Sequence, residues 1–253
     1  MKKIVFCFSF VLFLLHCKNV FFIRDYTPKS MPVEGKAKIA LVGFYPFTYS
    51  STTQSRVTTT TATLDYRSPM KKVFPIGKSL DEIPTSGIDV SVPSDTVKEF
   101  TLNYLSNVKK SGILEISKMV ESKGEGEKAV FSLKKRDVDY YLIGIHGPAF
   151  DDSPGNIGRT LLTAHLSILS LGTFPFWGSV GNNSTFLLYD KNLKLIDTKT
   201  YSDRYEFIAG WWGKEEHGSF NMSNSELPSH MKSQIYAPQI LEYSDYLNEF
   251  FQK

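Results

Sequence analysis

The sequence predicts an α/β (α+β) fold: a single mixed sheet in βαβαβ order, with a closing antiparallel hairpin and a C-terminal helix. Three observations lead to this fold class. Apolar runs of strand length alternate with helix-patterned segments between residues 39 and 146, two strand-like runs flank the polar turn Asp190-Lys191-Asn192, and helix-spaced apolar residues fill the end of the chain. Alternating strands and helices favour partly parallel pairing with right-handed crossovers.

The first predicted strand is the short apolar run at residues 39–44, which is followed by Pro46 and is typical of a buried strand. Residues 48–66 are rich in Thr and Ser. Because β-branched Thr fits a pleated surface, we expect a solvent-facing strand or hairpin there. Pro and Gly then recur up to Pro93. A structureless segment of this length is uncommon in a compact domain, so residues 48–93 are interpreted as an extended insertion and a candidate functional surface.

The clearest helix begins at Ser94 or Thr96. Thr96 and Glu99 have the spacing of a capping box, although Ser94 is an equally good N-cap. Apolar residues recur at helical spacing from Val97 onward, and Gly112 is expected to terminate the helix.

Three further elements are expected before residue 147. Residues 113–120 alternate roughly every second residue and predict a strand. Residues 125–135 predict a second helix, and the apolar run at 138–146 predicts a buried strand.

The second half of the chain predicts a hairpin and a helix. Residues 184–190 and 193–205 form the two strands on either side of the polar turn. Residues 229–251 are helical in pattern, and we expect the helix to be broken at Pro238.

The stretch from Thr160 to Gly181 contains no formally charged residue. It predicts a helix, with Leu161, Leu162, His165, Leu166, Leu169 and Ser170 on one broad face, followed by an exposed or half-buried loop. One interpretation is a buried amphipathic helix with a packed aromatic turn. The other is a patch that contacts a bilayer or a partner through Phe174, Phe176 and Trp177, since Trp and Phe suit interfaces. Polar residues and a Gly/Pro break disfavour a spanning helix.

The N-terminus has the layout of an export signal. Lys2 and Lys3 precede an apolar stretch of 12 residues, which would form a helix of about 18 Å and is shorter than the roughly 30 Å needed to span a bilayer. Cys17 stands where the signal would be cleaved and is a candidate for lipidation. Plain secretion and an uncleaved membrane anchor are the alternatives. We therefore expect a signal peptide at 1–16, a lipidated N-terminus and tether at 17–36, and a single domain at 37–253.

The sequence Leu14-Leu15-His16-Cys17 resembles a bacterial lipobox, with His16 in place of the usual small residue. The chain as a whole resembles spirochaete, leptospiral-type lipoproteins, whose lipoboxes are relaxed. This resemblance implies a diacylglyceryl group and an amide-linked acyl chain on Cys17, and a place in the bacterial cell envelope, at the outer membrane. The predicted element order is similar to periplasmic lipoprotein domains of the anticodon-binding-like type, which occur in curli-secretion proteins and in activators of peptidoglycan synthases.

Charge and cysteine content exclude several classes of protein. Removal of the signal takes Lys2 and Lys3 away and leaves 27 basic residues against 26 acidic ones, so electrostatic capture of nucleic acid is not expected. Cys7 leaves with the signal, and Cys17 is the one other cysteine, so no disulfide is expected. No zinc, EF-hand or phosphate-loop motif is present, and no cofactor is expected.

The favoured function is a non-enzymatic adaptor or binding module, anchored in the membrane, for an envelope protein or a cell-wall partner. One alternative is a subunit of a secretion or pore assembly, in which residues 48–66 or 160–181 enter the membrane. Another is a hydrolase or metal-binding protein centred on His146, Asp151 and His165, because ligands bind at strand ends in α/β sheets.

Overall fold

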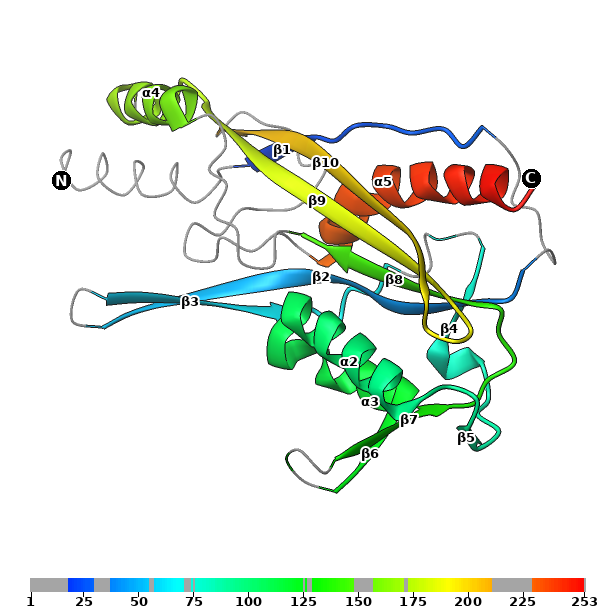
Figure 1. Cartoon of the computed structure of the whole chain (residues 1–253). Helices are drawn as coiled ribbons and strands as arrows, with labels where there is room; N and C mark the ends of the chain where they lie inside the picture. Colours follow the sequence, from blue (N-terminus) through cyan, green and yellow to red (C-terminus); the bar gives the residue numbers. More distant parts are fainter. Residues whose placement is uncertain are drawn as a thin grey trace. The chain divides into compact units, whose positions relative to one another are not determined.

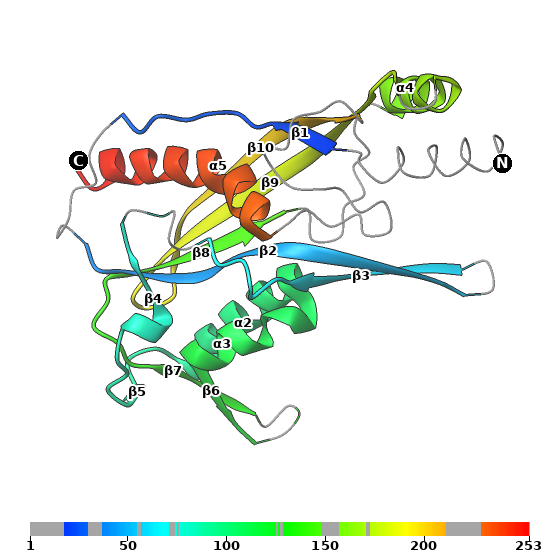
Figure 2. The same ribbon diagram turned by 180° about the vertical axis from the view of Figure 1, so that it is seen from behind.

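The computed structural model describes residues 18–29, 37–54, 57–70, 74, 76–124, 126, 129–147, 157–170, 173–210 and 229–252. The fold is mixed α/β, with a curled seven-stranded mixed sheet, a small antiparallel sheet and a C-terminal helix (Figures 1 and 2). The chain forms two compact units, each made of three separate segments. Unit 1 comprises residues 1–25, 152–182 and 202–235, and unit 2 comprises 26–151, 183–201 and 236–253. Residues 37–253 therefore contribute to both units.

The large sheet has the strand order β1-β10-β9-β8-β2-β3, with β4 paired to β2. Its strands are β1 (Lys18–Phe22), β2 (Ile39–Gln54), β3 (Val57–Leu64), β4 (Lys78–Ser79), β8 (Tyr140–His146), β9 (Phe176–Asp190) and β10 (Leu195–Gly210). β2 pairs with β8 and β4 in parallel, whereas β1 with β10, β2 with β3 and β8 with β9 are antiparallel. The predicted mixed pairing and the closing hairpin are confirmed.

A backbone irregularity in β2 sets which side chains face each side of the sheet. Gly43 and Phe44 have positive φ angles of 79° and 58°, and the register with β8 shifts between Gly43 and Pro46. A Cβ at Gly43 would lie 2.4 Å from the Gly144 carbonyl oxygen, so only glycine fits there. The shift turns Phe44 to the face that Leu41 occupies.

Unit 2 has a hydrophobic core on each face of the β2–β8 pair. One core is completed by α2 (Ser94–Val108) and α3 (Ile113–Met119), and the other by α5 (Ser229–Phe250). The two faces are covered by different helices in both views (Figures 1 and 2). Alternate residues of β8 belong to the two cores: Tyr141, Ile143 and Ile145 to the first, and Leu142 to the second. This strand is buried on both sides, as its apolar run predicts.

Two of the predicted elements between 113 and 135 are wrong. The strand expected at 113–120 is helix α3, and the helix expected at 125–135 contains β7 (Val130–Lys134). β7 pairs with β6 (Val120–Lys123) and β5 (Ile88–Asp89) in a second, antiparallel sheet, so the βαβαβ order and the single sheet are corrected. The buried residues of α3 are spaced as in a helix: Glu115, Ile116 and Met119. The same short sequence also alternates roughly every second residue, so it fits both a helix and a strand.

The first predicted helix begins at Ser94, one of the two expected starts, but the residues expected at its two ends are corrected. Pro93 takes the N-cap position of α2, and the Ser94 hydroxyl accepts a hydrogen bond from the Phe131 N–H at 3.0 Å. Gly112 does not end the helical region, because α3 follows it directly. A Cβ at Gly112 would meet Val108 and Tyr104, so glycine is needed for close packing.

Helix α5 continues through Pro238, where a break was expected. The proline removes one backbone hydrogen bond. Ile240, Tyr243 and Leu247 follow it at helical spacing and are fully buried. Packing of these turns outweighs the loss.

The Thr-rich segment forms the predicted hairpin. β2 and β3 pair from Phe47 with Leu64 to Gln54 with Val57, and a parallel strand β4 and a short 3-10 helix (Leu80–Glu82) follow in the insertion. β3 lies at one edge of the large sheet.

Residues 18–29, expected within the tether, are folded. β1 pairs with β10 in unit 1. In unit 2, the Tyr26 hydroxyl and the Lys29 N–H both donate to the Asp245 carboxylate, each at 2.7 Å.

Candidate functional site

Among the described residues, several of the most exposed large apolar side chains lie on the outward face of helix α4 (Ile157–Leu169) in unit 1. Its large apolar side chains are exposed, with exposed fractions of 54% for Leu161, 61% for Leu162, 74% for Ile168 and 80% for Leu169. His165 lies on the same face and is also exposed, and Leu166 lies at its border. We call Leu161, Leu162, Leu166, Ile168, Leu169 and the nearby Phe174 the apolar surface of α4.

The opposite face of α4 carries small and polar side chains. Thr163 is buried, and Thr160, Ala164, Ser167 and Ser170 are half-buried. The helix therefore has an inverted orientation, because its polar face is turned inward and its leucines outward. The predicted face is confirmed for its four leucines and His165, but Ser170 is half-buried and the exposed Ile168 was not included in it. This face is exposed and is not the buried face of a core helix.

Specific contacts with β9 and β10 hold α4 in this orientation. The Trp177 N–H donates to the Thr163 hydroxyl at 3.2 Å. Arg159 Nη2 donates to Glu206 Oε1 at 2.7 Å, and Trp177 Nε1 donates to Glu206 Oε2 at 3.1 Å. The Arg159 guanidinium also lies 4.3 Å from the centre of the Trp177 ring. We call these contacts among Arg159, Glu206 and Trp177 the clamp. The hydrogen bond from Arg159 holds the pKa of the Glu206 carboxyl below its ordinary value, so this carboxylate stays charged at neutral pH.

The three aromatic residues of the predicted contact patch have different surroundings. Phe174 is exposed. Phe176 is half-buried and packs on Phe207 with ring centres 5.7 Å apart, and Trp177 is half-buried in the clamp. The loop predicted after the helix ends at Phe176, where β9 begins. Five leucine and isoleucine residues of α4 thus form most of the apolar surface of α4. In the sequence they are indicated by a leucine-rich helical face within a stretch, Thr160 to Gly181, that has no charged residue.

The start of β1 lies at the same edge of unit 1 as this surface. Lys18 pairs with Gly210 and Phe22 with Glu206, so β1 begins opposite the end of β10. Phe176, which begins β9, packs on Phe207, a residue of the last part of β10. Figure 1 shows the start of β9 beside the end of β10. Cys17 itself lies outside the described residues, and Lys18 follows it directly.

His146 is a fully buried side chain of unit 2. Its Nδ1 lies 2.9 Å from the Ser184 hydroxyl, and rings of Phe44, Phe186 and Tyr236 surround it at 5.2–5.6 Å. Nε2 has no hydrogen-bond partner among the described residues. Burial lowers the pKa of His146 to about 3, so the imidazole is neutral at physiological pH and packs as a core residue.

The other members of the predicted His146 site are placed elsewhere. His165 belongs to unit 1, where its Nδ1 lies 2.7 Å from the Leu161 carbonyl oxygen. Asp151 lies outside the described residues. The three-residue site stays a prediction.

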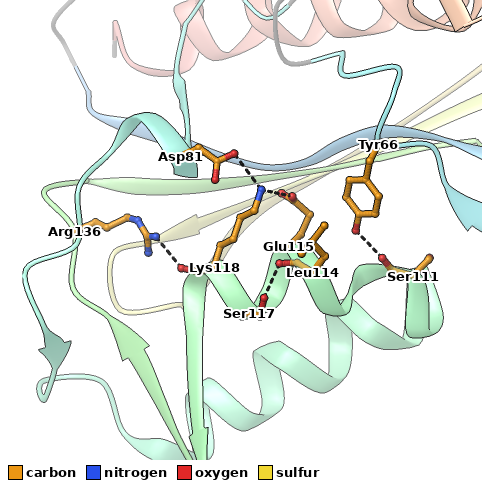
Figure 3. A network of polar contacts seen from close by, with 8 residues as sticks. All are labelled: Tyr66, Asp81, Ser111, Leu114, Glu115, Ser117, Lys118 and Arg136. Carbon is orange, nitrogen blue, oxygen red and sulfur yellow. Dashed lines mark hydrogen bonds and ion pairs between the residues drawn. The ribbon is translucent and has the colours of Figure 1, made fainter.

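A polar network of unit 2, which the sequence did not reveal, joins α3 to its neighbours (Figure 3). Lys118 Nζ donates to Glu115 Oε1 and to Asp81 Oδ2, each at 3.0 Å, and Arg136 Nη2 donates to the Lys118 carbonyl oxygen at 2.7 Å. The Tyr66 hydroxyl donates to the Ser111 carbonyl oxygen at 2.6 Å.

The pKa values of Lys118 and Tyr66 indicate that this network stabilises the fold. Burial lowers the pKa of Lys118, but hydrogen bonds to Glu115 and Asp81 outweigh that effect, and its net pKa is raised. Burial, with the charge of Glu115, raises the pKa of Tyr66 to about 12. Neither group is a base or nucleophile at neutral pH.

Among the described residues, no group of three or more His, Cys, Asp and Glu side chains could hold a metal ion. No helix in the same residues is long and apolar enough to cross a membrane.

Comparisons with known proteins found no matching family model, no matching curated protein and no matching solved structure.

Proposed function

We propose that this chain is a lipoprotein of the bacterial cell envelope, anchored at the outer membrane through Cys17, and that it acts as a non-enzymatic adaptor or binding module. One observation carries the proposal beyond the signal sequence: β1 begins at Lys18, directly after the candidate lipidation residue. Cleavage before Cys17 would leave every residue of β1 in place. The acyl chains would then be attached beside a paired strand and not at the end of a long tether.

The binding role is supported by the edge strand β3. Thr59, Thr61 and Thr63 are exposed on it, while Ala62 and Leu64 are buried. An edge strand presents unpaired backbone groups to which a partner's extended segment can pair. The partner class that fits is a protein of the envelope or a peptide of the cell wall that adopts an extended conformation.

Palmitate labelling tests the anchor. We expect the chain to incorporate label and a Cys17→Ala variant to lose it. Undiminished label in Cys17→Ala would remove the protein from the lipoprotein class.

Capture from detergent-solubilised envelopes tests the binding role. Thr59→Lys and Thr61→Lys introduced together should abolish capture of the specific partner, because charged edge strands resist pairing. Thr198→Lys on β10, also at an exposed position, is the matched control and should leave capture intact. Equal capture by both variants would exclude β3 as the binding edge.

A second candidate function is a subunit of an envelope assembly. The β2–β3 hairpin favours it, because Thr and Ser residues pair at four successive positions of its distal part, from Ser50 with Thr61 to Thr53 with Thr58. Its test is the size of the detergent-extracted protein. A ring-sized oligomer would support the assembly, and a monomer would support the adaptor.

A further inference from the structure

We propose that helix α4 lies in the surface of the membrane that holds the lipid anchor, with Leu161, Leu162, Ile168 and Leu169 inserted among the acyl chains. This inference rests on the proposed lipoprotein function and adds a second, non-covalent contact between protein and bilayer.

The inverted orientation of α4 is the first support. Exposed leucines are ordinary when they are scattered singly, but four large aliphatic side chains on one short helix form a contiguous patch. The helix could have buried them by rotating, yet Thr163 and the Arg159–Glu206–Trp177 clamp fix its polar face against β9 and β10. The outward face therefore needs an apolar environment from outside the unit.

The chemistry of the patch favours lipid over a protein partner. Protein interfaces rely on Trp, Tyr and Arg anchors, and Leu is under-represented among their energetically important residues. Here the exposed side chains are Leu and Ile with one Phe. Arg159 of α4 and Trp177 of β9 are both held by Glu206 and are not part of the exposed patch. No charged residue from Thr160 to Gly181 opposes insertion.

The position of the patch is the second support. α4 contacts the start of β9, and the start of β9 and the start of β1 lie at the same edge of unit 1. Acyl chains on Cys17 would enter the bilayer next to Lys18, so the membrane would meet unit 1 at this edge. At 13 residues, α4 is about 20 Å long, which suits a helix lying in the interface.

Energetically, the two contacts reinforce one another. The anchor confines the unit to the membrane surface, so insertion of α4 becomes an intramolecular step with a high effective concentration. The insertion in turn fixes the orientation of unit 1 on the bilayer. An apolar surface that is too weak to bind lipid by itself is therefore sufficient to hold α4 in the membrane once the protein is anchored.

Fluorescence of single-cysteine variants tests the inference. After processing, the mature chain has Cys17 as its one cysteine, so a cysteine at 162 or 169 can be labelled specifically. Leu162→Cys and Leu169→Cys, with Val90→Cys as the control at a 93% exposed site of unit 2, are labelled with NBD and reconstituted in phosphatidylethanolamine/phosphatidylglycerol vesicles. The chain without an added cysteine is the labelling control, because any label that it takes up must be at Cys7 or Cys17.

We expect blue-shifted emission at 162 and 169 and at least about twofold quenching by lipid-borne nitroxides, since an interfacial helix is buried about 5–10 Å. The label at 90 should show neither effect. Blue-shifted emission without lipid quenching would mean that protein covers the patch, from a second copy or another segment of this chain, and would overturn the inference. Water-like emission at both sites would overturn it as well.

The mass of the purified chain separates this inference from the proposed function. An acylated chain with no quenching at 162 and 169 refutes the α4 contact alone. A chain without acyl groups that is quenched at both sites refutes the anchor and supports the α4 contact. A chain that lacks both signals refutes both.

Discussion

Helices α2 and α4 are similar in length and both have an apolar face, yet they place that face in opposite environments. α2 buries Val97, Phe100 and Tyr104 in a core of unit 2, whereas α4 exposes Leu162 and Leu169 and buries Thr163. The pattern of a helix therefore indicates that a face exists, and only the packing shows what covers it. The outward apolar face of α4 therefore indicates a functional contact, whereas the buried face of α2 indicates a hydrophobic core.

Truncation of the two faces should give the largest contrast. Phe100→Ala is expected to destabilise unit 2 by about 3–5 kcal/mol, because it removes a buried aromatic side chain and leaves a cavity. Leu169→Ala should change stability by less than about 0.5 kcal/mol, since its side chain already contacts solvent. Chemical denaturation followed by circular dichroism measures both. Equal losses would mean that α4 is packed like α2.

Removal of Lys118 tests the polar part of the unit 2 interior. Glu115 is buried with 4% exposure, and Lys118→Met would leave its charge without this partner. We expect a loss of about 3 kcal/mol, typical of breaking one side of a buried ion pair. Lys123→Met is the matched control, because its pair with Glu121 is exposed and should be worth less than about 1 kcal/mol. Similar losses for both variants would contradict a structural role for the network.

His146 predicts a pH dependence that belongs to unit 2. Its pKa is lowered to about 3 by burial, so between about pH 6.5 and pH 3 the unfolded chain binds a proton that the folded chain does not. Stability should therefore fall as pH decreases, by up to about 1.4 kcal/mol per pH unit well below pH 6. Denaturation of the wild-type and His146→Phe proteins from pH 7 to pH 4 measures the difference. An unchanged slope in His146→Phe would contradict the burial of a neutral imidazole.

The contact between α4 and β9 should give a smaller effect. Thr163→Val keeps the volume but removes the acceptor of the Trp177 N–H, which we expect to cost about 1–2 kcal/mol. Thr198→Val at an exposed position of β10 is the control. A neutral Thr163→Val would indicate that α4 is not fixed by this contact.

The smallest effect on stability is expected on the apolar surface itself. Leu162→Glu with Leu169→Glu should leave unfolding within about 0.5 kcal/mol of the wild type, as should Leu102→Glu with Leu114→Glu at exposed positions of unit 2. Thermal unfolding checks both pairs. A large loss in the α4 pair alone would show that its leucines support the fold.

Long, strongly patterned elements could be predicted from the sequence. The run at 39–44, the strand at 138–146 and the hairpin around Asp190 each carry a pattern with one physical interpretation. Residues 113–119 are a helix where a strand was predicted, and residues 130–134 are a strand where a helix was predicted. Short apolar segments fit both periods. Their state is decided by pairing of β7 with β5 and β6, which local sequence does not encode.

The candidate site was predictable only in part. The uncharged stretch and the leucine face of α4 are visible in the sequence, but its outward direction depends on the bond between Thr163 and Trp177, two residues 14 positions apart. β1 was not predicted because its first two residues, Lys18 and Asn19, are polar and only three apolar residues follow them, and its partner β10 lies far along the chain. Both features arise from tertiary contacts within unit 1.

A nitroxide scan of residues 160–169, in the lipidated full chain in vesicles, measures whether the outward face of α4 contacts the bilayer. The measurement is the accessibility of each label to oxygen, which partitions into lipid, against a water-soluble nickel complex. We expect a helical period, with access to lipid highest at 161, 162, 165, 168 and 169 and lowest at 160, 163, 164 and 167. Uniform access to the nickel complex, or a period with its maximum at 163 and 167, would contradict it.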